Sequence, residues 1–216
     1  MHLRTIKRST HTPPRESPGL ERTPFGQLYN DMHGLIVGEW ASIEQAFRWA
    51  HAADPGALLF YNDAEGESLN LESAAIYALV KDFKRRGFPV DGVGLPMHVF
   101  DLNPDFAGIS ANLARLTALG LQVHIPEMDV AVPTGADGQV QKPECLDRQA
   151  HICRGIVTAC LAHPGCTAIQ TWGFTDKYSW IRWKTKGAKD AALPFDRNQV
   201  AKPAFVEFRQ ALVQSR

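Results

Sequence analysis

Apolar and polar positions along the chain follow two periods that alternate, and this alternation predicts helices and strands in turn. Apolar residues recur every three to four positions, the spacing of an amphipathic helix, over five segments: 42–56, 70–86, 104–120, 146–163 and 202–214. Short apolar runs between turn residues predict four strands, at 57–63, 90–100, 121–130 and 167–174. The order is therefore one helix followed by four strand–helix units.

Strands that alternate with helices predict a parallel sheet covered by helices. Either a doubly wound sheet or part of a (β/α)8 barrel has this order. No glycine-rich phosphate-binding motif follows any predicted strand, so the usual reason for a doubly wound nucleotide-binding sheet is missing. Residues 1–40 lack periodicity, and we interpret them as an irregular N-terminal segment that precedes a domain over 41–216.

Each predicted strand ends in polar or aromatic side chains that do not belong in a core. In chain order, the four ends carry Asn62 and Asp63, then His98, then the pair Glu127 and Asp129, and last Trp172. In barrel enzymes the chemistry lies at the carboxyl ends of the strands, on side chains from several of them. The strand ends therefore favour the barrel and predict an active site there. Taken singly, His98 could be a structural histidine, Asp129 a loop cap and Trp172 a core residue.

The run "GLQVHIPEMDVAV" places two carboxylates at the end of a strand that is otherwise apolar. Side chains alternate between the two faces of an extended chain, so Glu127 and Asp129 are predicted to point the same way. The same alternation predicts that they continue the face of Val123 and Ile125.

Composition narrows the possible partners and compartments. The 216 residues are 44% hydrophobic and 21% charged with zero net charge, which argues against nucleic acid or a membrane surface as the main partner. No apolar run is long enough to span a membrane, and no signal peptide precedes the domain, so the localisation is left open.

The four cysteines do not have the spacing of a zinc site, so we expect no metal. Cys145 and Cys153 are interpreted as buried thiols. Cys160 and Cys166 flank the turn "LAHPG" and could either meet across it or remain buried thiols.

Several longer segments resemble glycoside hydrolase family 10 endo-β-1,4-xylanases. They are "AFRWAHAADPGALLFYND", "VKDFKRRGFPVDGVGLPMHV", "LARLTALGLQVHIPEMDV", "IQTWGFTDKYSWI" and "PFDRNQVAKPAF". The resemblance runs in order from about Ala41 to the end and covers the second half of the family's domain. It implies a (β/α)8 barrel that hydrolyses xylan with retention of configuration, without a cofactor.

The resemblance also implies roles for particular residues. Glu127 matches the catalytic nucleophile, and Asp129 and His98 match residues that hold and tune it. Trp172 and Trp180 match aromatic residues that line the sugar site, and Asn62 belongs to the same substrate-binding region. A bridge between Cys160 and Cys166 matches a similar one in the family, and members are usually secreted.

Two family features are missing from the matched positions. Pro96 stands where the family usually has a glutamine two residues before the histidine. The acid/base glutamate follows an asparagine in the family, and the sequence contains no Asn–Glu pair. About fifty residues before the first matched strand cannot hold four strand–helix units of about thirty residues each. We therefore expect a C-terminal half-barrel of about four units.

The sequence is compatible with three functions. The chain is a xylanase-type enzyme that supplies the nucleophile half of the site, a catalytically inactive sugar-binding half-barrel, or a truncated fragment that needs a partner chain. Xylan or its oligosaccharides are the expected ligand. Cutting a barrel exposes strand edges at "ALLFYN" and "TAIQTW", so a homodimer through these edges is also expected.

Overall fold

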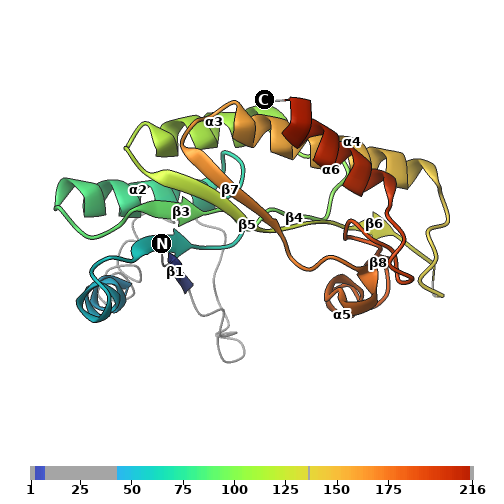
Figure 1. Cartoon of the computed structure of the whole chain (residues 1–216), viewed down its shortest axis with the longest axis horizontal. Coiled ribbons are helices and arrows are strands. Elements are labelled where there is room, and N and C mark those ends of the chain that lie inside the picture. Colours follow the sequence, from blue (N-terminus) through green and yellow to red (C-terminus); the bar gives the residue numbers. More distant parts are fainter. Residues whose placement is uncertain (1–2, 8–42, 136, 215–216) are drawn as a thin grey trace, which may run out of the picture.

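The chain forms a parallel sheet whose strands run side by side in one direction. The structure, a computed structural model, describes residues 3–7, 43–135 and 137–214. The sheet contains β1 (Leu3–Lys7), β2 (Leu58–Asn62), β3 (Gly92–Gly94), β4 (His98–Val99), β5 (Gln122–Val130) and β7 (Cys166–Thr171). Their order is β1-β2-β3-β5, with β7 on the other side of β5 and β4 beside the second half of β5 (Figure 1).

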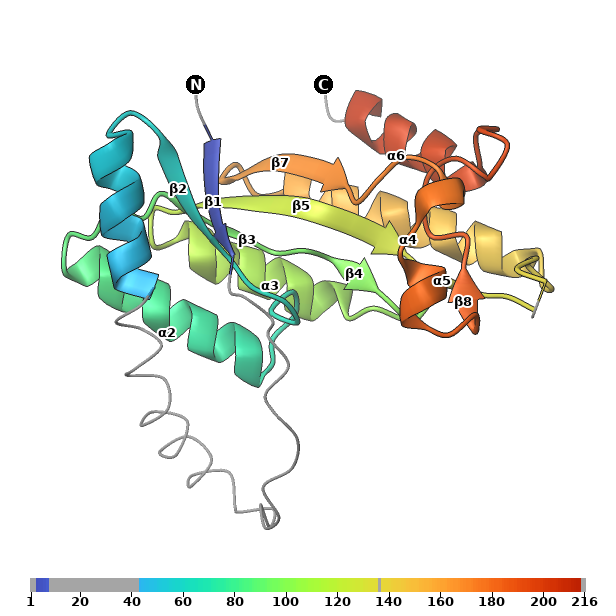
Figure 2. The same ribbon diagram turned by 90° about the horizontal axis from the view of Figure 1, so that it is seen from below.

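Helices alternate with these strands, as the sequence predicts. They are a helix over 43–53, α2 (Leu71–Arg85), α3 (Phe106–Thr117), α4 (Glu144–Leu161) and α6 (Pro203–Gln214). In Figure 1, α3, α4 and α6 lie together on one side of the sheet. Figure 2 gives the view from below, where the strands lie in front of α3 and α4. The predicted alternation of strands and helices is confirmed.

Local signals fix where the helices begin and where α2 ends. Asn70 caps α2 by accepting a hydrogen bond from the Ser73 amide at 2.7 Å, and the Ser73 hydroxyl accepts from the Asn70 amide in return. Asp105 caps α3 through the amide of Gly108 at 2.9 Å. Gly87 follows α2 with a φ of 67°, a conformation that glycine adopts without strain.

The main core lies between the helices and the face of the sheet that they cover. Strand β2 and the helices α2, α3 and α4 all contribute fully buried side chains to it. Examples are Leu59 of β2, Val80 and Phe83 of α2, Leu113 of α3 and Ile156 of α4. Phe47, on the helix over 43–53, packs edge-on against Phe83, with the ring centroids 5.8 Å apart. Burial on this scale supplies the main driving force for folding.

The N-terminus differs from the sequence-based prediction of an irregular segment over 1–40. Leu3–Lys7 forms β1, which pairs in parallel with β2 from Leu3 opposite Leu58 to Lys7 opposite Asn62. Five residues are too few to show a hydrophobic period, and a parallel edge is held by backbone hydrogen bonds that any side chain allows. The rest of the predicted segment, residues 1–2 and 8–40, lies outside the described residues.

Cys160 and Cys166 are joined as a disulfide, with their Cα atoms 5.2 Å apart, and Cys145 and Cys153 are buried free thiols. Burial raises the pKa of the Cys153 thiol to about 12, so this thiol stays protonated and unreactive. Among the described helices, none is long and apolar enough to cross a membrane. The described residues also contain no cluster of three or more His, Cys, Asp or Glu side chains suited to a metal ion.

The two outer strands of the sheet are β1 and β7. The edge predicted at "ALLFYN" is covered by β1, so the prediction of an open edge at that strand is wrong, and the edge lies one strand further out. On the other side, β7 pairs with β5 and with no other described strand. An unpaired edge can take up another strand through its free backbone groups.

We predict that the 216-residue chain associates through the β7 edge at micromolar concentration. Sedimentation velocity should show a dimer or larger species, and Gln170→Lys, at an exposed position of β7, should reduce association. Thr158→Lys places the same charge on the exposed surface of α4 and serves as the matched control. A compact monomer with cooperative thermal unfolding at these concentrations would contradict the prediction.

Candidate active site

The strand β5 carries both predicted carboxylates, and it contains one residue more than its neighbours at this point. Gly94 pairs with His124 and His98 pairs with Asp129, so a step of four residues on β3 and β4 faces a step of five on β5. The pairing of β5 with β7 shifts in the same place, after Ile125. An extra residue on one strand is a β-bulge, and it changes which face the following side chains occupy.

The bulge moves Glu127 and Asp129 to the face opposite Val123 and Ile125. Before it, Val123 and Ile125 pack in the main core under the helices, while His124 stacks on Phe60 across the other face. After it, Met128 and Val130 take over the core side. The prediction that the carboxylates continue the face of Val123 and Ile125 is therefore wrong.

The local cause of the bulge is Pro126, immediately before Glu127. Proline has no backbone N–H and cannot donate to a neighbouring strand, so regular pairing is interrupted there. The pair itself stays on one side, because Glu127 and Asp129 are still two residues apart. Both carboxylates therefore lie on the face of the sheet that the helices do not cover, the same face as His124 and Phe60.

A second interruption places His98. The predicted strand over 90–100 is divided into β3 and β4 by Leu95–Met97, and Met97 has a φ of 66°. His98 follows directly and pairs with Asp129 on β5. The histidine is thus aligned with the carboxylates on the neighbouring strand.

His98 lies between the two carboxylates. Its Nδ1 is 3.1 Å from Asp129 Oδ1, and its Nε2 is 3.5 Å from Glu127 Oε2. All three side chains are largely buried; the exposed fraction is 17% for His98, 9% for Glu127 and 1% for Asp129. A protonated imidazole carries an N–H at both nitrogens and can donate towards both carboxylates.

The surroundings favour the protonated form of His98. Burial alone would lower the pKa of the ring, but the contact with Asp129 and the charges of Asp129, Glu127 and Glu67 outweigh it, so the pKa is raised above the usual value. The site is therefore a short row of alternating negative, positive and negative groups.

Two further side chains donate hydrogen bonds to the carboxylates. Asn62, at the end of β2, donates from Nδ2 to Glu127 Oε1 at 3.2 Å. Trp180 donates from its indole Nε1 to Asp129 Oδ2 at 2.8 Å, and its ring centroid is 4.9 Å from that of His98. Both residues are among those predicted from the sequence.

Asn62, His98, Glu127 and Trp180 line one cavity of about 440 Å³, whereas Asp129 does not line it. Its lining consists of Asn62, Asp63, Ala64, Glu65, Glu67, Pro96, His98, Phe100, Glu127, Trp180 and Lys184. Trp172 is not among them; it follows β7, is 44% exposed, and its ring centroid is 6.4 Å from that of His98. The cavity has a carboxylate, a cation and aromatic faces within reach of one another.

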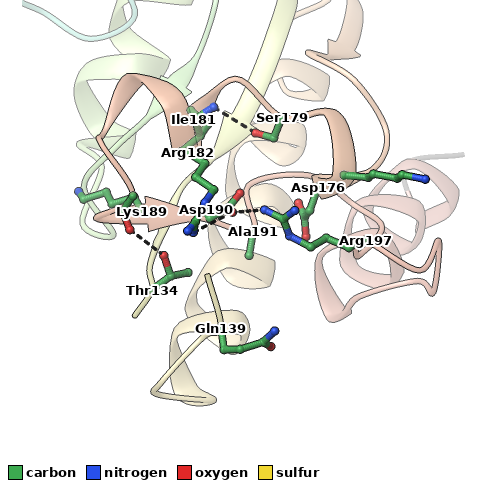
Figure 3. Close-up of polar contacts among 12 residues, drawn as sticks. Thr134, Gln139, Asp176, Ser179, Ile181, Arg182, Lys189, Asp190, Ala191 and Arg197 are labelled. Atoms are coloured by element: carbon green, nitrogen blue, oxygen red, sulfur yellow. Dashed lines mark hydrogen bonds and ion pairs between the residues drawn. The ribbon is translucent and has the colours of Figure 1, made fainter. Parts of the chain in front are cut away.

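The loop after β7, which carries Trp180, is held by buried charges. Asp176 accepts hydrogen bonds from the Leu193 amide at 2.8 Å and from Lys202 Nζ at 2.9 Å. Arg197 lies 2.5 Å from Asp190, and Arg182 approaches the same carboxylate at 3.8 Å, as Figure 3 shows. These contacts join β8 (Lys189–Asp190) and α5 (Ile181–Lys184) into one folded unit.

Comparisons with known proteins place the chain in a family. The sequence profile of glycosyl hydrolase family 10 matches residues 24–211. The chain belongs to glycosyl hydrolase family 10. The fold of this family is a (β/α)8 barrel, and the parallel sheet described above is part of such a barrel.

Individual relatives support the same assignment. The chain is 40% identical over 170 residues to endo-1,4-beta-xylanase B of Thermotoga neapolitana, a match that covers 79% of this chain and 48% of the relative. It is similar to native xylanase 10B from Thermotoga maritima, with a TM-score of 0.74, 42% identity and coverage of 80% of this chain and 52% of the other. Xylanase 10B from Thermotoga petrophila, solved in complex with xylobiose, gives a TM-score of 0.75 and 41% identity, with coverage of 81% and 52%. The chain thus spans about half the length of these family 10 proteins.

Three charged residues of the cavity were not predicted from the sequence. They are Glu65, Glu67 and Lys184. Glu65 and Glu67 follow β2 closely in "NDAEGES", so the rule that polar residues after a strand mark the site would have found them if extended by a few positions. Lys184 ends α5, far along the chain, and no local signal connects it with the cavity.

We predict that Asp129→Asn lowers the pKa of His98, because it removes the nearest negative charge. The ring nitrogen shifts of His98, followed by NMR between pH 5 and 9, measure this change. Because the folded pKa is raised, protonated His98 stabilises the wild-type chain fully below the unfolded pKa of about 6.5. That contribution is lost as the pH rises through the folded pKa.

The stability difference between the wild type and Asp129→Asn should therefore shrink as the pH rises above about 6.5. Urea unfolding at several pH values gives this difference. A His98→Gln background serves as the control, since it should remove the pH-dependent part. An unchanged titration of His98 in Asp129→Asn would contradict the assignment of its partner.

Proposed function

We propose that this chain supplies the nucleophile side of a retaining glycosidase site that cleaves internal β-1,4-xylosidic bonds in xylan. The observation that carries the proposal is the position of Glu127. Its carboxylate lies on the wall of the cavity and is held by Asn62 and His98, in a chain of glycosyl hydrolase family 10. The relatives named above are xylanases.

Glu127 acts as the nucleophile in this proposal. A carboxylate oxygen forms a bond to the anomeric carbon while the bond from that carbon to the leaving oxygen breaks, and the leaving oxygen takes up a proton from an acid. Water then attacks the glycosyl-enzyme ester and gives a proton to the conjugate base of that acid, which releases the sugar and regenerates the Glu127 carboxylate. Two inversions at one carbon give net retention.

His98, Asp129 and Asn62 hold the nucleophile in position. The Asn62 amide fixes one carboxylate oxygen of Glu127, and the His98 ring lies against the other. Asp129 keeps the His98 ring in its orientation and favours its protonated form. Fixing the attacking oxygen before substrate arrives lowers the entropic part of the barrier.

Trp180 and Trp172 are proposed to contact the sugar. Trp180 lines the cavity, and its indole N–H donates to Asp129, which fixes the orientation of the ring. Trp172 is nearly half exposed at the rim. The C–H groups of a pyranose form apolar patches that suit the face of an aromatic ring.

One observation favours a second candidate function, sugar binding without efficient hydrolysis. The resemblance locates the acid/base glutamate after an asparagine, and the sequence has no Asn–Glu pair. In this alternative, the chain binds xylo-oligosaccharides, and turnover of xylan requires a partner chain that provides the proton.

The leaving group separates these possibilities. A sugar alkoxide leaves poorly without a proton, and general acid assistance is typically worth about 10²–10⁴-fold in rate. An acidic phenol leaves without that help. We therefore predict that the purified chain hydrolyses an activated aryl xyloside faster than xylan by at least about a hundredfold.

Glu127→Ala should abolish the aryl xyloside activity, by on the order of 10³-fold or more, because no covalent intermediate can form. Glu72→Ala removes an exposed carboxylate from the first turn of α2 and is the matched control. Efficient xylan hydrolysis by the wild-type chain would contradict the inference that the chain lacks a proton donor. Turnover that survives Glu127→Ala would contradict the nucleophile. Oligosaccharide binding in calorimetry without any turnover would support the second candidate.

A further inference from the structure

The residue before the site histidine has an unusual backbone. Met97 has a φ of 66°, in the left-handed region that a side chain other than glycine rarely adopts, and its side chain is only 1% exposed. Such a conformation persists where surrounding contacts hold it, and it is found most often at functional sites. The contacts of Met97 therefore determine the position of the His98 backbone.

Both backbone groups of Met97 are held by residues of the site. Its carbonyl accepts a hydrogen bond from the Asp129 amide at 3.3 Å, which ties it to β5. Its amide donates to Glu67 Oε1 at 3.3 Å. A carboxylate from the loop after β2 is thus connected, through one residue, to the ring that lies between Glu127 and Asp129.

The loop that carries Glu67 is itself fixed. Asn112 of α3, which is 1% exposed, donates from Nδ2 to the carbonyls of Gly66 at 2.8 Å and Glu67 at 3.2 Å. Arg115 orients that amide by donating to Asn112 Oδ1 at 2.8 Å. At Gly66 an added Cβ would lie 2.3 Å from the Ile76 side chain, so the loop lies directly against α2.

Glu67 also acts on His98 through its charge. Burial alone would lower the pKa of His98, and Glu67 is one of the three carboxylates that raise it instead. Burial raises the pKa of Glu67 itself, and the amide of Met97 and the charge of His98 oppose that rise. The two groups therefore favour each other's charged forms.

We propose that Glu67 is a positioning residue of the site: its carboxylate holds the left-handed Met97 backbone and so fixes the place of the His98 ring between Glu127 and Asp129. The catalytic consequence rests on the proposed function, whereas the geometric one does not. No substrate contact is assigned to Glu67.

The first test uses the wild-type chain and NMR. The side-chain carboxyl carbon of Glu67 and the amide proton of Met97 should titrate together with a single pKa, because an amide proton shifts when its acceptor loses charge. A Met97 amide that does not respond to the titration of Glu67 would overturn the proposal. This measurement needs neither a variant nor enzymatic activity.

The second test compares variants at Glu67. Glu67→Ala removes the acceptor, so hydrogen exchange of the Met97 amide should become at least tenfold faster and the ring resonances of His98 should move. Glu67→Gln keeps an oxygen that can accept the hydrogen bond, so its exchange rate should stay within about threefold of the wild type. Glu65→Gln removes the same charge from the same loop without a contact to Met97, and should leave the exchange rate unchanged.

Activity on an aryl xyloside is the third readout. Glu67→Ala should lose at least tenfold in kcat with little change in KM, and Glu67→Gln should restore most of that loss. If the wild-type chain shows no turnover, the proposed function fails, and the NMR experiments still decide the role of Glu67. Unchanged hydrogen exchange at the Met97 amide and unchanged His98 resonances in a folded Glu67→Ala chain would overturn the positioning role of Glu67.

Discussion

The placement of one histidine between two carboxylates is the constraint on which the rest of the site depends. His98 approaches Asp129 on one ring nitrogen and Glu127 on the other. Neither contact is possible unless the carboxylates share a face and the histidine lies level with them on the next strand. Their two-residue spacing provides the first condition, the bulge at Pro126 turns that shared face away from the helices, and the break between β3 and β4 provides the second condition. Regular strands would have given a better sheet and no such arrangement.

The surrounding structure stabilises this irregular arrangement. The sheet and the helices on one side of it form a regular core that tolerates two interrupted strands. Polar contacts from three different regions then fix the site: Asn62 at the end of β2, Trp180 on the loop after β7, and Glu67 before α2. The loop that carries Trp180 is held by the buried pairs at Asp176 and Asp190, away from the cavity. The polar side chains of the site are therefore attached to rigid elements, as a pre-organised site requires.

The sequence predicts the regular elements well and the irregular ones poorly. Helices such as α2 and α3 were predictable because their apolar spacing, caps and terminal glycines are local signals. The closeness of Asn62, His98 and Glu127 was predictable because the parallel topology brings the strand ends together. The face of Glu127 was not, because alternation assumes an unbroken strand, and one inserted residue reverses it. β1 was missed because pairing through the backbone leaves little trace in five side chains, and Glu67 was missed because its contact is with a backbone amide thirty residues away.

Trapping of the covalent intermediate would identify the group that attacks the sugar, which we propose is Glu127. A 2-fluoro aryl xyloside with a good leaving group forms the glycosyl-enzyme ester readily but hydrolyses it slowly, because fluorine disfavours the positive charge of both transition states. Intact-mass spectrometry should show one added fluoroxylosyl group, and peptide mapping should place it on Glu127. A label on any other carboxylate, or a folded chain that takes up no label, would show that Glu127 is not the nucleophile.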